Sequence, residues 1–459
     1  MGILSRNGYE FTPRAEEADV LVVNTCSFIA PAQKESIDTI LEMAEYKKFG
    51  VAKKLIVAGC LVERFRAQIL EQIPEVDAVV GTGEVENILA AVEGELRFDA
   101  GAAAILPSYL YHDLTPRILS TPRHAAYMKI AEGCDHPCTF CIIPQLRGKF
   151  RSRRFESVVR EAENLAAAGV REVTLIGQDT TSYGEDLRLR DGLAVLLERL
   201  AGVEGLQWVR FLYCYPNRVT QRLLDTIAAH PRLAKYMDMP LQHASRNVLA
   251  RMKRGSSGEA FLQLLRRIRA TIPGVSLRTS FIVGFPGETE SDFKELCDFV
   301  QATEFDWMGV FAYSDVDNAS SFALDGNVDE DTIKDRRNHL MEIQQNISSR
   351  KLRRFRGQRA TAIVEGPSKD TPLVWEARLE GMAPDIDGKL YLNDIEVPES
   401  QLSAQTGDVV TVEITETHEY DLVGRVVEIF DVPRVVAMES AATAPVQRVL
   451  TTAALRILA

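Results

Sequence analysis

The chain has 459 residues, of which 46% are hydrophobic and 26% are charged, as in an ordinary folded protein of about three domains. This composition excludes a disordered chain, a collagen and a small disulfide-rich domain. The sequence contains no uninterrupted apolar run of about 18 residues, and no basic segment followed by an apolar one stands at its start. We therefore expect a cytoplasmic protein with no membrane span and no secretory signal.

The net charge of −12 is concentrated toward the C-terminus. Residues 359–431 contain five basic and 16 acidic residues, which gives this segment alone a net charge of −11. Nucleic-acid binding depends mainly on lysine and arginine, so we expect no direct nucleic-acid partner. An acidic module attracts a basic partner, although acidic surfaces also serve solubility alone.

Residues 19–93 alternate between predicted strands and helices. Strands are expected at residues 19–24, 54–58 and 78–80, and helices at residues 33–45, 61–72 and 84–92. This alternation predicts a parallel sheet covered by helices. We assign residues 1–93 to an N-terminal α/β domain and residues 94–123, which contain three prolines, to a linker.

A second alternating series occupies residues 124–330. Its apolar runs lie at residues 127–130, 173–176, 209–212, 237–239, 277–283 and 308–311. Six strand–helix units are fewer than the eight of a closed barrel and predict an open, partial (β/α)6 barrel. Residues 331–357 are expected to form a connecting helix, and the alternation over residues 358–431 predicts a small antiparallel β-barrel. The tail at residues 432–459 is expected to be disordered.

Cys134, Cys138 and Cys141 form a C-x3-C-x2-C triplet directly after the first strand of the second series. In a chain without a secretory signal, grouped cysteines indicate a metal site or catalysis rather than disulfides. A structural zinc site normally has four protein ligands, and His136 lies between the cysteines, where its reach to the same metal is poor. Three cysteines suit a 4Fe–4S cluster with one iron left open. The triplet therefore favours an iron–sulfur cluster over zinc.

This triplet, with Phe140 before its last cysteine, resembles the signature of the radical S-adenosylmethionine (SAM) superfamily, and two later segments are similar to its cofactor motifs. Gly177, Gln178 and Asp179 end the second strand, where the resemblance implies contacts to the amino group and ribose of SAM. Gly284 ends the fifth strand and resembles the glycine motif on the adenine side. Glycines at the carboxyl ends of strands let the backbone approach a ligand, and barrel chemistry lies at that rim.

Cys26 and Cys60 each follow a predicted parallel strand, so we expect their thiols to meet at one edge of the sheet. Taken alone, they are equally well explained as two unrelated buried cysteines. Together with the triplet and the C-terminal β module, they make residues 1–430 resemble the methylthiotransferase family, whose last domain is TRAM-like. The resemblance implies a second 4Fe–4S cluster on Cys26 and Cys60.

The sequence departs from this family pattern at its start. Family members begin with a strand that ends in a cysteine, and that cysteine completes the site of Cys26 and Cys60. Here residues 1–9 resemble the helix after that strand, so the third ligand is absent from the chain as given. The missing cysteine is explained either by a start codon placed too far downstream or by a genuine truncation. We expect the chain as written to be impaired in sulfur transfer.

Within the family, three segments look most like the branch that modifies a ribosomal protein, namely residues 141–148, 240–245 and 383–388. The acidic C-terminal module supports the same branch independently, because ribosomal proteins are basic and tRNA is not. The resemblance implies methylthiolation of the β-carbon of an aspartate in the twelfth small-subunit ribosomal protein, free or on the ribosome. A tRNA-adenosine methylthiotransferase stays open as the main alternative, and a non-catalytic, zinc-dependent RNA-binding protein as a weaker one.

The chemistry implied by the resemblance is radical transfer. An unactivated C–H bond has no usable acidity, so a side chain cannot remove its hydrogen as a general base. The resemblance implies that SAM on the first cluster is cleaved by one electron, supplied by a donor protein, to the radical that takes the hydrogen, while the second cluster carries the sulfur. Cys214 and Cys297 are expected to be structural. Asp385 and Asp387 are candidates for holding the substrate.

Overall fold

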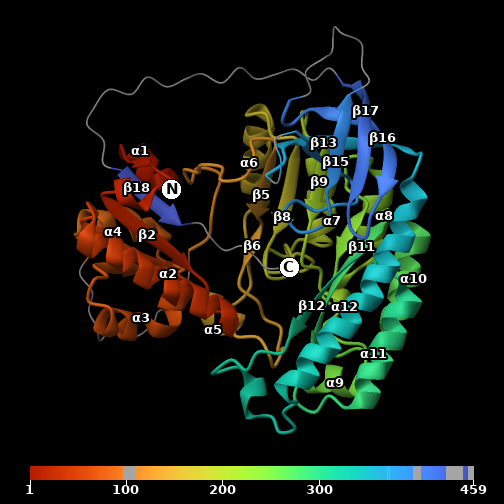
Figure 1. The fold of residues 1–459 in the computed structure, drawn as a ribbon, viewed down its shortest axis with the longest axis horizontal. Helices are drawn as coiled ribbons and strands as arrows, with labels where there is room; N and C mark the ends of the chain where they lie inside the picture. The colour runs from red at the N-terminus through yellow and green to blue at the C-terminus, as the bar shows by residue number, and fades with distance from the viewer. Residues whose placement is uncertain are drawn as a thin grey trace.

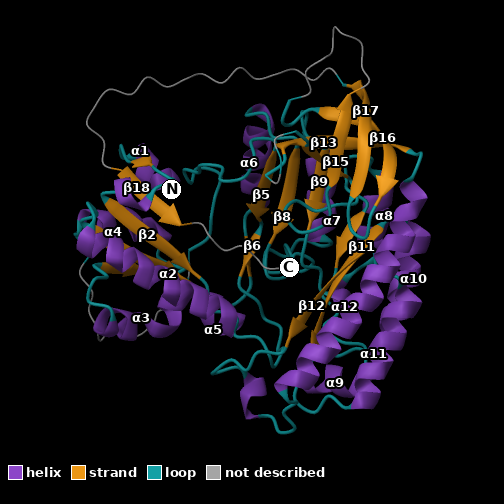
Figure 2. Cartoon of the chain, in the orientation of Figure 1, coloured by secondary structure: helices purple, strands orange, loops and turns teal. Residues whose placement is uncertain are grey.

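The fold is a mixed α/β arrangement, seen in a computed structural model that describes residues 1–96, 107, 109–369, 371, 373–395, 405–430 and 448–452. Figure 1 shows the N-terminal sheet on one side, a series of parallel strands in the centre and a β-barrel above them. Figure 2 shows the helices on the outer faces of these strands. In the described part of the chain, none of the helices has the length and apolar character needed to cross a membrane.

The N-terminal sheet follows from apolar strands that alternate with helices, as predicted. β2 (Val20–Thr25), β3 (Lys54–Gly59) and β4 (Ala78–Val80) pair in parallel, and β1 (Glu10–Phe11) lies at the far edge. The helices are α1 (Gly2–Arg6), α2 (Ala30–Phe49), α3 (Cys60–Gln72) and α4 (Ile88–Glu93), with short 3-10 turns at Ala15–Glu17 and Val85–Asn87. Leu21 and Val23 of β2 enter one core cluster and Val20 and Val22 another, so both faces of the sheet are buried.

One strand of this sheet comes from the other end of the chain. β18 (Arg448–Thr452) lies between β1 and β2 and pairs in parallel with both, which gives the order β1-β18-β2-β3-β4 (Figure 1). The predicted disorder of the 432–459 tail is therefore wrong for these five residues. Their sequence, RVLTT, suits a strand, but a run this short carries little periodic signal, and its strand partners lie more than 400 residues away.

Removing β18 is expected to destabilise the N-terminal domain, because β1 and β2 then lose the strand that joins them. We expect deletion of residues 431–459 to cost on the order of 2 kcal/mol and to lower the thermal midpoint of this domain by roughly 8–16 °C. Deletion of residues 453–459 is the matched control, since it keeps β18. Limited proteolysis followed by mass spectrometry should show faster cleavage within residues 1–93 only in the longer deletion, and equal cleavage in both would contradict the role of β18.

The centre of the molecule is a partial barrel of six parallel strands, as predicted. They are β5 (Ala125–Lys129), β8 (Glu172–Ile176), β9 (Trp208–Phe211), β10 (Tyr236–Asp238), β11 (Ser276–Val283) and β12 (Trp307–Ala312). They pair as β5-β8-β9 and β10-β11-β12. The segment before β10 joins the two sheets, because the N–H of Ala234 donates to the carbonyl of Val209 at 3.0 Å.

Helices between these strands form the outer layer of the partial barrel (Figure 2). They are α6 (Phe155–Ala167), α7 (Gly192–Ala201), α8 (Gln221–Ala229), α9 (Arg246–Arg251), α10 (Gly258–Thr271) and α11 (Glu290–Thr303). Smaller elements line the loops: β6 (Ala131–Glu132), α5 (Ile143–Arg147), β7 (Arg151–Ser152) and 3-10 turns at Pro216–Arg218 and Ser320–Ala323. α11 begins with a capping box between Thr289 and Asp292, which satisfies backbone N–H groups at the helix start.

The C-terminal module is a closed barrel of five strands, reached through α12 (Glu330–Leu352) and a 3-10 turn at Arg353–Phe355. Its strands are β13 (Arg359–Pro367), β14 (Trp375–Leu379), β15 (Leu390–Ile395), β16 (Val409–Thr417) and β17 (Leu422–Ile429), in the order β13-β14-β15-β17-β16. Four of its five strand pairings are antiparallel, as predicted, whereas β15 and β17 pair in parallel. An odd number of strands cannot alternate in direction around a closed ring, so one pair must be parallel.

Buried charges hold this barrel against the partial barrel. The carboxylate of Glu172 pairs with Arg210 at 2.7 Å and with Arg378 at 2.6 Å, and all three side chains are almost fully buried. Asp387 belongs to the same interface, because its side chain is only 2% exposed and accepts hydrogen bonds from Tyr236 Oη at 2.7 Å and from the N–H of Ala383 at 2.8 Å. The hypothesis that Asp387 holds the substrate is therefore wrong.

We expect Glu172→Gln to destabilise the protein by about 3 kcal/mol, because it leaves two buried arginines without their shared carboxylate. Burial raises the pKa of Glu172, but Arg378 and Arg210 outweigh it and lower the pKa below its ordinary value. The stabilisation is therefore fully present above the ordinary glutamate pKa and is lost as the pH falls through the lowered one. The urea concentrations at the midpoints of unfolding of the wild type and the variant should therefore converge at acidic pH. Glu163→Gln, which breaks an exposed pair with Arg199, is the control and should change the midpoint little.

Candidate functional site

The cysteine triplet lies at the carboxyl end of β5, in the loop that follows β6. Gly133 precedes it with a φ of +79°, and a Cβ there would lie 2.2 Å from the carbonyl oxygen of Lys149, so only glycine fits this turn. Burial raises the pKa of Cys134 to about 11 and that of Cys141 to about 12, and the neighbouring Cys138 adds to both shifts. The three thiols belong to one short loop, and their role as cluster ligands stays a prediction.

The surroundings of the thiols fit an iron–sulfur cluster. The N–H of Ile143 donates to Cys141 Sγ at 3.5 Å, and Arg254 Nη1 lies 3.5 Å from Cys138 Sγ. Hydrogen bonds to the ligand sulfurs tune such clusters. Within the described ranges, no three His, Cys, Asp or Glu side chains are placed to hold a single metal ion. The triplet thus offers three cysteine sulfurs, and N–H donors lie beside those of Cys138 and Cys141.

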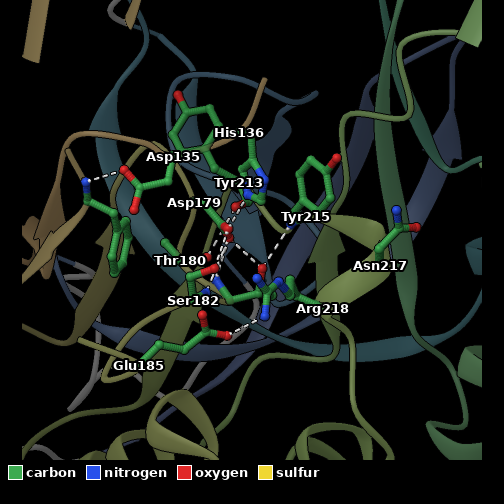
Figure 3. A network of polar contacts seen from close by, with 12 residues as sticks. Asp135, His136, Asp179, Thr180, Ser182, Glu185, Tyr213, Tyr215, Asn217 and Arg218 are labelled. Atoms are coloured by element: carbon green, nitrogen blue, oxygen red, sulfur yellow. Dashed lines mark hydrogen bonds and ion pairs between the residues drawn. The ribbon is translucent and has the colours of Figure 1, made fainter. Parts of the chain in front are cut away.

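His136, the alternative fourth ligand for zinc, makes other contacts. Its Nε2 lies 2.7 Å from Asp179 Oδ2, and its ring stacks on Tyr215 with the ring centroids 3.7 Å apart (Figure 3). Arg254, which contacts Cys138, lies over the same Tyr215 ring at 4.4 Å from its centroid. These contacts tie the cysteine loop to the loops that follow β8 and β9.

Asp179 is engaged within the protein. Its carboxylate takes five hydrogen bonds, from His136 and from the backbone and hydroxyl groups of Thr181 and Ser182 (Figure 3). Burial raises its pKa, but these donors outweigh burial and lower the pKa overall. Asp179 therefore shapes the loop after β8, and its predicted contact with SAM stays a prediction.

Gln178 and Gly284 have the features of ligand-binding positions. Gln178 Oε1 is buried and has no hydrogen-bond partner among the described residues, which leaves an acceptor for the amino group of a ligand. Gly284 ends β11 with a φ of +77°, and a Cβ there would lie 2.2 Å from Ile333. Phe140 packs beside Phe285 in a small apolar cluster at the same rim. Their binding of SAM remains a prediction.

Glu288 is a site residue that sequence reasoning missed. Its carboxylate accepts from the N–H of Gly284 at 2.6 Å and of Phe285 at 3.2 Å, and it pairs with Arg336 at 3.0 Å. Burial raises the pKa of Glu288 to about 6. The carboxylate therefore holds the glycine turn at the end of β11, and its place in the segment GFPGE was the available signal.

Cys26 and Cys60 lie side by side at the carboxyl edge of the N-terminal sheet, as the strand order predicted. β2 and β3 pair so that Thr25 is opposite Gly59, and each cysteine is the next residue. Burial raises the pKa of Cys60, and Arg147 of the partial barrel opposes this effect from 3.3 Å away. Cys214 and Cys297 lie in the main hydrophobic core instead, which confirms their structural placement.

We expect His136→Ala to keep the iron content and visible absorption of the reconstituted protein, because His136 is bound to Asp179 and is not needed as a ligand. Cys138→Ser should lose most of both, since it removes one of three sulfur ligands. Metal analysis and absorption spectra of wild type and both variants provide the measurement. A colourless wild-type protein that holds zinc, and loses it with His136→Ala, would contradict this assignment.

Known families match all three parts of the chain. A family model of the radical SAM superfamily matches residues 128–300, the uncharacterized protein family UPF0004 matches residues 1–81, and the TRAM domain matches residues 357–427. The bounds that we gave to the domains stay predictions.

Relatives of similar length extend these matches over nearly the whole chain. A ribosomal protein uS12 methylthiotransferase RimO from Solibacter usitatus is 61% identical over 92% of this chain and 90% of that protein. Proteins of the same name from Koribacter versatilis and Trichlorobacter lovleyi are 56% and 43% identical, and the matches cover 92% and 94% of those proteins. With these identities over nearly full lengths, the chain belongs to the radical SAM methylthiotransferase family.

Proposed function

We propose that this protein transfers a methylthio group to ribosomal protein uS12 by radical SAM chemistry, at the β-carbon of an aspartate. The observation that carries the proposal is 61% identity to a uS12 methylthiotransferase over 90% of its length, in a chain whose cysteine triplet lies at the rim of a partial barrel. The protein is therefore an enzyme, and its substrate is a protein rather than tRNA.

In this proposal the three thiols of the triplet hold a 4Fe–4S cluster that binds SAM. The loaded cluster supplies the one-electron chemistry that side chains cannot provide. The protein positions the cofactor: Gln178 offers its unpaired carbonyl oxygen, and the turn at Gly284, held by Glu288, lets the backbone approach the ligand. Asp179 and His136 keep the cysteine loop in place.

We propose Cys26 and Cys60 as two of the ligands of a second 4Fe–4S cluster that carries the sulfur. Their support is adjacency at one sheet edge and the burial of Cys60, which is only 8% exposed. Exclusion of water from such an edge favours radical chemistry, since it limits side reactions. An electron-donor protein completes the set of partners.

The charge of the C-terminal barrel favours a basic protein substrate over tRNA. Residues 359–431 have a net charge of −11, and exposed carboxylates of the described part lie at Asp385, Asp394, Glu416, Glu419 and Glu428. Such a surface repels a phosphate backbone and attracts lysine and arginine side chains. The tRNA alternative would need a basic module at this place.

The experiment is mass spectrometry on cells with and without this gene, on both the small-subunit ribosomal proteins and hydrolysed tRNA. We expect uS12 to lose the mass of one methylthio group from an aspartate in cells without the gene, and tRNA adenosine to be unchanged. Loss of methylthioadenosine with intact uS12 would overturn the substrate assignment.

Single variants expressed in cells that lack the gene test the site itself, by whether they restore the modification of uS12. Cys138→Ser should restore no modification, because the first cluster loses a ligand. Cys297→Ala should restore it, since Cys297 lies in the core away from the rim. Equal restoration by both variants would exclude the triplet from the reaction.

A further inference from the structure

One turn of helix connects the two groups of cysteines. α5 starts two residues after Cys141, and the N–H of Ile143 donates to Cys141 Sγ at 3.5 Å. At the end of the helix, Arg147 Nη2 donates to Cys60 Sγ at 3.3 Å. A helix of five residues rises only about 7 Å. The triplet and the N-terminal cysteine pair are thus joined by a short, regular element, which Figure 1 shows between the two domains.

The guanidinium of Arg147 is held on its other side by a buried carboxylate. Arg147 Nη1 pairs with Glu132 Oε1 at 2.7 Å, and Lys129 pairs with Glu132 Oε2 at 2.6 Å. The Glu132 side chain is only 9% exposed. Because the guanidinium is planar, holding one of its nitrogens also directs the other, here toward the Cys60 sulfur.

Apolar contacts surround this link. Cys60 shares a buried cluster with Ile142 and Leu146 of the segment around α5, and with Val316 and Ala319. The hydroxyl of Thr82 also donates to the carbonyl of Leu146 at 3.2 Å. Cys60 therefore lies within the contact between the N-terminal domain and the partial barrel.

We propose that Arg147 is a positioning residue that, through the Cys60 sulfur, holds the N-terminal cysteine pair at a set place relative to the triplet. The role in turnover rests on the proposed function, in which a sulfur from the pair must reach a carbon activated at the triplet. Misplacement of reacting groups by about 1 Å can cost on the order of 100-fold in rate. Lysine cannot replace Arg147 fully, because a single ammonium lacks the fork that reaches both Glu132 and Cys60.

The first test uses amide hydrogen exchange on the full chain without cluster. We expect Arg147→Gln to raise exchange about tenfold at residues 60–63 and 143–147, as loss of a charge-assisted hydrogen bond would. In a Cys60→Ala background the same change should have a smaller further effect, because only the pair of Arg147 with Glu132 is then lost. Arg64→Gln is the matched control: Arg64 also crosses between the domains, to the carbonyl of Asp317 at 3.2 Å, and its effect should add to that of Cys60→Ala.

Additive effects of Arg147→Gln and Cys60→Ala would overturn the proposal, and so would unchanged exchange in Arg147→Gln. Circular dichroism of each variant excludes unfolding as the cause, and Arg147→Lys, which keeps the charge, should restore part of the protection. This test does not depend on activity, so it stands even if uS12 is not the substrate.

The second test uses the enzyme with its clusters and SAM bound. It separates a positioning role of Arg147 from a general loss of enzyme activity. Arg147→Gln should form 5′-deoxyadenosine from SAM at the wild-type rate, since the triplet is intact, and should give about 100-fold less methylthiolated product per 5′-deoxyadenosine. Arg64→Gln should keep the wild-type ratio. A proportional loss of both products in Arg147→Gln would contradict a positioning role.

Discussion

The arrangement of the whole protein depends on the direction of its parallel strands. In a parallel sheet every strand ends at the same edge, so residues that follow neighbouring strands meet there whatever their distance in sequence. The N-terminal sheet places Cys26 beside Cys60 in this way, and the partial barrel gathers the cysteine loop, Gln178 and Gly284 at one rim. α5 then connects the two edges, so that two sites built by separate sheets lie in one structure.

The polar groups of the rim divide into two kinds. Asp179 and Glu288 are saturated by hydrogen bonds within the protein and hold the loops on which the site stands. Gln178 has a buried oxygen without a partner among the described residues, and Cys138 and Cys141 each have an N–H donor beside their sulfur. A buried polar group without a partner is costly, so these groups are the ones that a bound cofactor would satisfy.

Sequence reasoning found the strands, the six-unit partial barrel and the five cysteines of the site, because periodicity and spacing are local signals. It assigned Asp179 to the cofactor from its motif and named Asp385 and Asp387 only as candidates for holding the substrate. In the structure, Asp179 accepts hydrogen bonds from its own loop and from His136, its contact with SAM stays a prediction, and Asp387 is buried between the two barrels. Whether a polar residue faces a ligand depends on how other segments pack against it. A short sequence motif contains no information on that packing.

The sequence by itself determined the family, the alternation of strands and helices in the N-terminal domain and the partial barrel, and the cysteines proposed to carry the chemistry, since these depend on residue type and local spacing. Only the tertiary structure decided that β18 enters the N-terminal sheet, that β15 pairs in parallel with β17, and that Arg147 contacts Cys60. The reason is the same in each case: these contacts join residues that are distant in the chain, and their formation depends on strand pairing, ring closure and domain packing rather than on local preference.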